Sequence, residues 1–265
     1  MKTIRTLHII MAMAGEGSRF KNAGYTVPKP LIKVEGIELF RRALSSLNYY
    51  CTPENLLETK YTFIVRSEFI SEYEIDKKIK MYYPNANILA VDKTTRGALE
   101  TIMIAKDYID DDDCLISVDC DIQFDCKEYD NKLMHRRITN SEQPLVMSFY
   151  SKNPIYSFVN PGLTKNTGTF IVEKNPISNY ALGGCYYLGL GKNFKKAAKK
   201  YIEDFEQHKI HTKELYLSLV INYIIDIIHK DIEVYDMNFH YDHYWSFGTP
   251  YDLENYNYDR NIWDE

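Results

Sequence analysis

The chain has little that points to a membrane, to secretion or to bound zinc. No apolar run reaches the roughly 18 residues that a membrane-spanning helix needs, and no charged-then-apolar leader stands at the start. Cysteine is scarce: the five cysteines are an odd number and none forms a C-x-x-C pair, so neither a disulfide framework nor a zinc motif is indicated. We therefore expect a protein of the reducing cytoplasm that has no membrane partner.

An excess of positive charge is missing as well. The chain has 32 Lys and Arg residues against 37 Asp and Glu, which gives a net charge of −5 at pH 7. Nucleic-acid-binding domains usually carry a clear basic excess, so we expect no nucleic-acid partner. No linker or low-complexity stretch divides the 265 residues, and we expect residues 1–265 to form a single domain with a large buried core. The oligomeric state is open, a homo-oligomer included.

The first 150 residues alternate between apolar runs and helical patterns. Strands are predicted at 7–14, 61–66, 87–92, 114–120 and 145–150, and helices at 37–47, 68–81, 97–109 and 127–138. Strands that alternate with helices over short connections are typical of an α/β fold. We expect a doubly wound, mostly parallel, Rossmann-like sheet.

The pattern changes after residue 151. Extended pieces at 170–174 and 181–188 are followed by helices at 194–208 and 213–229, strands at 231–236 and 241–247, and a last helix from Pro250. We expect this half to add a lobe to the same domain.

The most informative segment is the glycine-rich turn GEGSRF at 15–20, which follows the first predicted strand. Glycine has no Cβ, so backbone N–H groups in such a turn can approach a phosphate closely. Arg19 lies in the turn, and Lys29 follows between Pro28 and Pro30, which adds two positive charges. The turn lacks the G-K-[ST] ending of a Walker loop and the third glycine of the Rossmann fingerprint. The combination predicts a polyphosphate site of another kind.

The whole run, GEGSRF followed by PKPLI at 28–32, resembles the N-terminal signature of the nucleotidyltransferases that make nucleotide sugars, also called sugar-nucleotide pyrophosphorylases. The resemblance extends over nearly the whole chain. Its motifs are most similar to those of enzymes from capsule and surface-polysaccharide loci. It implies that Arg19 and Lys29 hold the triphosphate and neutralise the transition state. The nucleotide-binding positions that it implies are Ala12, Ala14, Gly15, Gly17, Ser18, Arg19, Lys29, Gly97 and Asp119.

Two carboxylates, Asp119 and Asp121, stand at the end of the apolar run 114–118. Carboxylates at the end of a buried strand are costly unless they meet a cation, and Mg²⁺ takes one or two of them together with phosphate oxygens. The family resemblance places the metal ligand at Asp121 and implies a second ligand late in the chain. We predict Glu214 for that role, with Asp242 and His243 as competitors, and Mg²⁺ as the cofactor.

A second acidic run, YIDDDD at 108–113, ends a predicted helix. Negative charge is unfavourable at a helix C-terminus. We interpret the run as a solvated loop rather than as a calcium site.

The acceptor site is predicted in the second half. The segment FIVEKNP at 170–176 resembles the family's V-x-E-K-P motif, although Asn175 is inserted, and it implies that Lys174 meets the acceptor phosphate and Glu173 a hydroxyl. Gly184, in ALGGCYY at 181–187, resembles a strand that lines the acceptor, while a glycine there can also mark only a bulge. WSFGTPYDL at 245–253 is interpreted as a structural helix start, with Thr249 as N-cap.

Together these motifs predict a Mg²⁺-dependent nucleotidyltransferase with Arg19, Lys29 and Lys174 as its catalytic cations. It would join a nucleoside triphosphate, with a pyrimidine favoured and CTP first, to a phosphorylated small acceptor and release pyrophosphate. The acceptor is a sugar phosphate or a non-sugar phosphate such as a phosphorylated amino acid amide or polyol. The alternative is a metal-dependent glycosyltransferase that uses Asp119-Cys120-Asp121 as a D-x-D motif.

Overall fold

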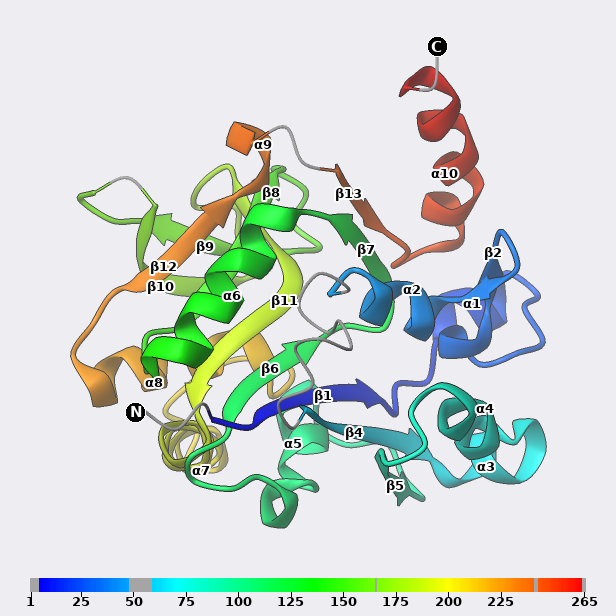
Figure 1. Cartoon of the computed structure of the whole chain (residues 1–265), viewed down its shortest axis with the longest axis horizontal. Coiled ribbons are helices and arrows are strands. Elements are labelled where there is room, and N and C mark those ends of the chain that lie inside the picture. Colours follow the sequence, from blue (N-terminus) through cyan, green and yellow to red (C-terminus); the bar gives the residue numbers. More distant parts are fainter. Residues whose placement is uncertain (1–4, 48–58, 165, 241–242, 264–265) are drawn as a thin grey trace.

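Nine strands form one sheet in the part of the chain that the structure, a computed structural model, describes: residues 5–47, 59–164, 166–240 and 243–263 (Figure 1). The order is β5-β4-β1-β6-β11-β8-β12-β10-β9. The bounds are β1 (Leu7–Met13), β4 (Thr59–Arg66), β5 (Asn87–Val91), β6 (Cys114–Val118), β8 (Leu145–Tyr150), β9 (Ser157–Pro161), β10 (Thr167–Glu173), β11 (Tyr180–Leu190) and β12 (Ile232–Asp236). Strands of both halves of the chain share this sheet, because β11 pairs with β6.

The sheet is mixed. The strands β5, β4, β1 and β6 are parallel, and so are β8 and β12, but β11 runs antiparallel to both β6 and β8, and β10 runs antiparallel to β12 and β9. The α/β fold expected from the sequence is therefore confirmed, whereas the second half contributes more antiparallel pairing than we expected. For β9 and β10 the antiparallel pairing has a local cause. A short turn joins them, whereas a parallel pair needs a long crossover connection.

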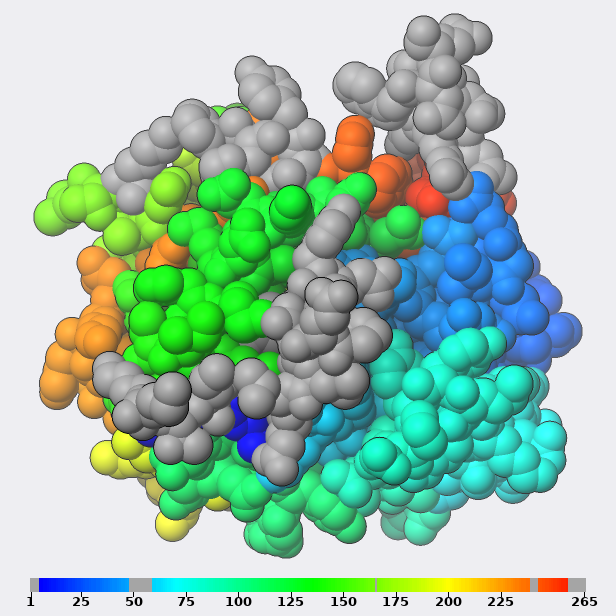
Figure 2. All heavy atoms as spheres, viewed as in Figure 1, coloured from blue at the N-terminus to red at the C-terminus, as the bar shows by residue number. Residues whose placement is uncertain are grey.

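Helices cover both faces of the sheet. One face carries α2 (Leu39–Ser45), α3 (Ser67–Tyr73), α4 (Ile75–Tyr82) and α6 (Lys127–Thr139), and the other carries α5 (Ala98–Met103), α7 (Gly191–Glu206) and α8 (Leu217–Ile228). Figure 2 shows atoms of α6 in green and of α3 and α4 in cyan on the outside of the first face. Alternate side chains of β1 point into the two layers: Ile9 and Met11 pack in one, and Ile10 packs in the other. Burial on both sides explains the continuous apolar run.

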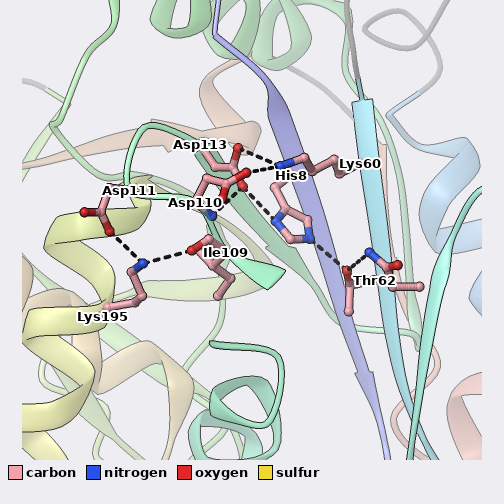
Figure 3. Close-up of polar contacts among 9 residues, drawn as sticks. His8, Lys60, Thr62, Ile109, Asp110, Asp111, Asp113 and Lys195 are labelled. Carbon is pink, nitrogen blue, oxygen red and sulfur yellow. Dashed lines mark hydrogen bonds and ion pairs between the residues drawn. The ribbon is translucent and has the colours of Figure 1, made fainter. Parts of the chain in front are cut away.

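The apolar run of β1 contains one histidine, His8, which is fully buried (Figure 3). Its Nδ1 lies 3.1 Å from Asp113 Oδ2, and its Nε2 lies 2.8 Å from Thr62 Oγ1. Asp113 also accepts a hydrogen bond from the Asp110 backbone N–H at 3.0 Å, and Lys60 Nζ lies 3.5 Å from its other oxygen. The interpretation of this acidic run as a solvated loop is therefore wrong for Asp113, which is 2% exposed because it pairs inside the fold.

Some element bounds differ from the sequence-based expectation. The helix expected at 68–81 is broken into α3 and α4 at Glu74, whose φ is 51°. Phe69 and Ile75 are both buried but stand six residues apart, a spacing that would put them on different sides of a continuous helix. The helix expected at 97–109 ends as α5 at Met103 and is followed by a 3-10 turn, η3 (Lys106–Tyr108), and α8 begins at Leu217 rather than at residue 213.

Smaller elements complete the N-terminal part. They are α1 (Ser18–Asn22), a 3-10 turn η1 (Lys29–Leu31), and a two-stranded hairpin of β2 (Lys33–Val34) and β3 (Ile37–Glu38). The hairpin turns at Glu35 and Gly36, whose φ angles are 50° and 80°, as a type I′ turn requires. None of these elements was predicted, since each is too short to show a periodic pattern.

The C-terminal part of the chain packs against the N-terminal part. After α9 (Met237–His240), β13 (His243–Ser246) pairs antiparallel with β7 (Ile122–Asp125), and α10 (Pro250–Trp263) follows. Tyr256 of α10 belongs to a separate apolar cluster that also contains Phe20 of α1 and Val34 of β2, so the first half of α10 lies near these two elements (Figure 1). Thr249 and Asp252 cap α10 reciprocally, because each backbone N–H donates to the other's side chain, at 2.6 and 3.2 Å. This confirms the predicted helix start. Within the described ranges, no helix is long and apolar enough to cross a membrane.

Candidate functional site

The order of the parallel strands locates the candidate site. From β1 the chain passes to β4 and β5 on one side and then to β6 on the other, so the strand order reverses between β1 and β6. Ligands of open α/β sheets bind outside the carboxyl ends of the strands at such a reversal. The glycine turn at 15–17 follows β1, and Asp119 and Asp121 follow β6. Both predicted motifs therefore stand at the same edge of the sheet.

A cavity of about 440 Å³ lies at this edge. The residues that line it are Ala12, Met13, Gly15, Gly17, Ser18, Arg19, Phe20, Lys29, Pro30, Cys120, Glu214 and Gly248. Six of the nine predicted nucleotide positions thus share one cavity, whereas Ala14, Gly97 and Asp119 do not line it. Sequence reasoning missed the contribution of Gly248, because its motif was interpreted as structural only.

Different physical reasons explain the presence of glycine at positions 15 and 17 of the turn. Gly17 has a φ of 60°, and a Cβ added to it would lie 3.4 Å from Lys29 Cβ, so the turn packs closely against the lysine segment. Gly15 has no such constraint: a Cβ there would meet nothing within 4 Å, and its φ is not positive. Packing within the chain does not require a glycine at position 15, whereas close approach of a ligand to its backbone would.

Lys29 and Asp121 are in direct contact. The Lys29 ammonium donates a hydrogen bond to Asp121 Oδ2, and the two side chains are 20% and 22% exposed. Burial by itself would lower the pKa of Lys29, but the Asp121 carboxylate outweighs it, so this pKa lies above its ordinary value of 10.5. Lys29 is therefore charged at neutral pH, and its ammonium faces the cavity beside the Phe20 ring, 5.4 Å from the ring centre.

Asp119 lies between β6 and β11, against Gly184. Its backbone N–H donates to Gly184 O at 2.8 Å, and a Cβ added to Gly184 would lie 2.7 Å from Asp119 Oδ2. Gly184 has a φ of 75°, a second reason for glycine at this position. Burial and the charge of Asp121 raise the pKa of Asp119 to about 8, and the Glu173 carboxylate adds to the rise. A carboxyl group whose pKa is raised by neighbouring carboxylates in this way is a site where a cation would be stabilising.

The C-terminal turn closes the site. The Phe247 backbone N–H donates to Asp121 O at 2.7 Å, and Arg19 Nη1 donates to Gly248 O at 3.4 Å. A Cβ added to Gly248 would lie 3.8 Å from Asp121 Oδ2. The turn at 247–249, which sequence reasoning treated as structural alone, thus contacts two of the predicted functional residues.

The predicted acceptor residues stand at the end of β10 and reach α8. Glu173 accepts hydrogen bonds from Ser157 Oγ and Ser218 Oγ, and burial raises the pKa of Glu173 although these bonds oppose the rise. Lys174 Nζ donates to Tyr216 Oη at 2.9 Å, and this hydrogen bond raises the pKa of Lys174. Sequence reasoning did not single out the serines or Tyr216, since nothing near them in the sequence pairs them with β10.

The residues predicted as further metal ligands are spread out. Glu214 lines the cavity, His243 is exposed and stacks on Trp245 with ring centres 5.5 Å apart, and Asp242 lies outside the described residues. Among the described residues, no three His, Cys, Asp or Glu side chains form a group that could hold a metal ion by themselves. Mg²⁺ that arrives with phosphates needs only one or two protein carboxylates, and the oxygen donors of Asp121 and Asp119 fit that requirement.

Gly97 has a packing role. Its φ is 150°, and an added Cβ would lie 2.5 Å from Leu215 O, whose carbonyl accepts a hydrogen bond from the Leu99 N–H at 3.0 Å. The loop before it reaches the glycine turn, because Thr94 Oγ1 donates to Glu16 Oε1 at 3.1 Å. The predicted role of Gly97 in binding the nucleotide stays a prediction.

Comparison with known proteins identifies solved structures that share the fold of this chain. No model of a known family and no curated protein matches the chain. A nucleoside-diphosphate-sugar pyrophosphorylase from Vibrio cholerae is similar in structure, with a TM-score of 0.74, 23% identity, and 93% of this chain and 98% of that chain covered. A UDP-glucose pyrophosphorylase from Acinetobacter baumannii has a TM-score of 0.67 and 16% identity, with 94% of this chain and 91% of that chain covered. The inositol-1-phosphate CTP transferase from T. maritima has a TM-score of 0.65 and 15% identity, with 95% of this chain and 93% of that chain covered.

Two of these proteins are named pyrophosphorylases and one is named a CTP transferase, and the likeness spans nearly the full length of each. At these identities it establishes a shared fold. The fold is thus the one that the family resemblance of the sequence implies.

Proposed function

We propose that the chain is a Mg²⁺-dependent nucleotidyltransferase that joins a nucleoside triphosphate to a phosphorylated small acceptor. The observation that carries the proposal is the contact of Asp121 with Lys29, which lines the cavity at the ends of β1 and β6 together with Gly15. A fixed cation and an unobstructed glycine backbone in one cavity, with a carboxylate in contact with that cation, suit a metal-bound triphosphate. The shared fold supports the same reading.

The proposed reaction is an in-line displacement. An oxygen of the acceptor phosphate attacks the α-phosphorus of the triphosphate, the bond from that phosphorus to the bridging oxygen breaks, and pyrophosphate leaves with the electron pair. Lys29 and Arg19 neutralise phosphate charge. Asp121 would hold the Mg²⁺, with Asp119 secondary, and Glu214, which lines the cavity, is the further ligand that the sequence predicts. When bound, Mg²⁺ would supply further charge neutralisation on the phosphates.

The step needs no nucleophile from the protein. Cys120 lines the cavity, but burial and the charge of Asp121 raise the pKa of its thiol to about 12. A thiol with such a pKa stays protonated at neutral pH and is a poor nucleophile. This agrees with direct transfer between the two substrates.

The two halves of the chain would divide the substrates within one domain. Residues 1–150 bind the nucleotide, and Glu173, Lys174 and Gly184 of residues 151–265 bind the acceptor. We propose a pyrimidine triphosphate, CTP first, and either a sugar phosphate or a non-sugar phosphate such as a phosphorylated amino acid amide or polyol. One structural neighbour is named an inositol-1-phosphate CTP transferase, which supports CTP and a polyol phosphate as candidate substrates. Precursor synthesis for a capsule or surface polysaccharide is the proposed setting.

A substrate screen tests the proposal. Each of the four nucleoside triphosphates is mixed with Mg²⁺ and a panel of phosphorylated acceptors, and pyrophosphate release is measured. We expect release only when triphosphate, acceptor and metal are all present, and a greater Mg²⁺ requirement in Asp121→Asn than in Asp119→Asn. Release of a nucleoside diphosphate from a nucleotide sugar would instead support the D-x-D glycosyltransferase, and no release with any pair would refute nucleotidyl transfer.

A further inference from the structure

The carboxylate that is proposed to hold the metal already has a cationic partner. Lys29 Nζ donates to Asp121 Oδ2, the oxygen that also faces Gly248. Neither residue is a freely moving surface group, because only 20% and 22% of the two side chains are exposed. Lys29 thus places a positive charge directly on the carboxylate that is proposed to hold the metal.

The backbone holds Lys29 in that position. The 3-10 turn η1 places it between Pro28 and Pro30, with the Leu31 N–H donating to Pro28 O at 2.8 Å. Proline fixes φ, so the segment has few alternative conformations. Gly17 packs against the Lys29 Cβ from the other side. The backbone and the Cβ of Lys29 are therefore held in place, and only the rest of the side chain can change its partner.

An ammonium and a divalent cation on one carboxylate repel each other, so the Lys29 ammonium weakens the binding of a metal ion at Asp121. A free metal ion would have to bind against this repulsion, or displace Lys29 and leave a largely buried ammonium without a partner, and either course is costly. A metal–triphosphate complex removes this cost, since its phosphate oxygens can accept hydrogen bonds from Lys29 while the metal meets Asp121. The exchange leaves every charge paired.

We propose that Lys29 is a selectivity residue that makes Asp121 accept a metal–triphosphate complex in preference to a free metal ion. The inference rests on the proposed function, since it takes Asp121 as the metal carboxylate. It predicts an effect of opposite sign on two ligands: loss of the Lys29 charge improves binding of the bare metal and weakens binding of the triphosphate.

Mn²⁺ alone is the probe, measured by electron paramagnetic resonance of the free ion during titration into the purified protein at constant ionic strength. Wild type should bind it weakly, and a non-hydrolysable triphosphate should increase the affinity. Lys29→Met, which keeps the length of the side chain without its charge, should bind Mn²⁺ about tenfold more tightly without nucleotide. That fold-change corresponds to the loss of one competing charged hydrogen bond. Lys29→Gln is the second variant, should Lys29→Met lose its native circular dichroism.

The controls locate the effect at Asp121. The double variant Lys29→Met/Asp121→Asn should lose the gain. Lys132→Met is the matched control for net charge, because Lys132 pairs with Glu233 at 2.9 Å and is similarly exposed, at 32%, but Arg136 also holds that glutamate. It should leave Mn²⁺ binding at the wild-type level. Unchanged Mn²⁺ affinity in both Lys29 variants, or a gain that survives in the double variant, would overturn the inference.

The two proposals can fail separately. If pyrophosphate release is observed but the Lys29 variants bind Mn²⁺ no better than wild type, the selectivity role of Lys29 is refuted and the proposed transferase activity is not. If Lys29→Met gains Mn²⁺ affinity but no triphosphate affects binding in wild type, the lysine shields a metal carboxylate in a protein with another function.

Discussion

Gly184 lies directly against Asp119: a Cβ added to the glycine would be 2.7 Å from Asp119 Oδ2. The contact joins β11 of the second half to the carboxylate that follows β6 of the first half. It therefore couples the lobe proposed to bind the acceptor to the proposed metal site.

Gly184→Ala should impair both stability and activity, because alanine at a φ of 75° is strained and its methyl group displaces Asp119. Strain of this kind costs about 1–3 kcal/mol. Gly36→Ala is a matched control, since Gly36 has a φ of 80° but nothing within 4 Å of an added Cβ. Urea denaturation should show a loss of stability in both variants, and kcat should fall only in Gly184→Ala. Equal activity in the two would mean that the position of Asp119 is unimportant.

The charges at Arg19 and Lys29 should matter for turnover rather than for folding. Both line the cavity, and neither belongs to an apolar cluster. Arg19→Ala and Lys29→Ala should each lower kcat/KM at least about a hundredfold, or roughly 2.7 kcal/mol of transition-state stabilisation. Lys21→Ala is the control, because Lys21 is an exposed cation of the same turn of helix that does not line the cavity. Wild-type turnover in either site variant, with intact circular dichroism, contradicts the assignment.

The site was predictable from the sequence where it depends on neighbours along the chain. The run at 7–14 is continuously apolar because both faces of β1 are buried, and the glycine turn follows it directly. The short strands β7 and β9 gave no signal, because each exists only by pairing with a strand distant in the sequence or with a hairpin partner. Tyr216 and Gly248 were missed for the same reason, since their contacts with Lys174 and Arg19 arise only in the folded chain.

The buried pair of His8 and Asp113 predicts a pH-dependent contribution to stability. Burial would raise the pKa of Asp113, but the hydrogen bonds from His8 and from the Asp110 N–H outweigh it and hold this pKa below its usual value of 3.8. A carboxyl group with a lowered pKa stabilises the fold above its unfolded-state pKa, and this contribution is lost as the pH falls through the folded-state value. Asp113→Ala should therefore lose about 1–3 kcal/mol at pH 7, and its deficit should shrink below pH 3.8.

Urea denaturation across pH 2.5–7 measures this deficit. Asp112→Ala is the control, because Asp112 is 78% exposed and pairs only at the surface with Arg5. Since Asp113 precedes β6 at the edge opposite the cavity, activity per folded molecule should not change. A deficit that stays constant from pH 7 to pH 3 would show that the charge of Asp113 contributes nothing.

The acceptor assignment depends on Lys174, which stands at the end of β10 and is held by the Tyr216 hydroxyl. Removing its charge should weaken acceptor binding and leave the triphosphate nearly unaffected, because Lys174 does not line the nucleotide cavity. One charged hydrogen bond is worth roughly 1.5–3 kcal/mol, so the acceptor KM should rise about ten- to a hundredfold in Lys174→Ala. Tyr216→Phe keeps the lysine but frees its ammonium, and should give a smaller rise in the same KM. Calorimetry with the triphosphate alone is the control for both variants. If triphosphate binding collapses while the acceptor KM holds, Lys174 serves the nucleotide, and the division of the substrates between the two halves of the chain is wrong.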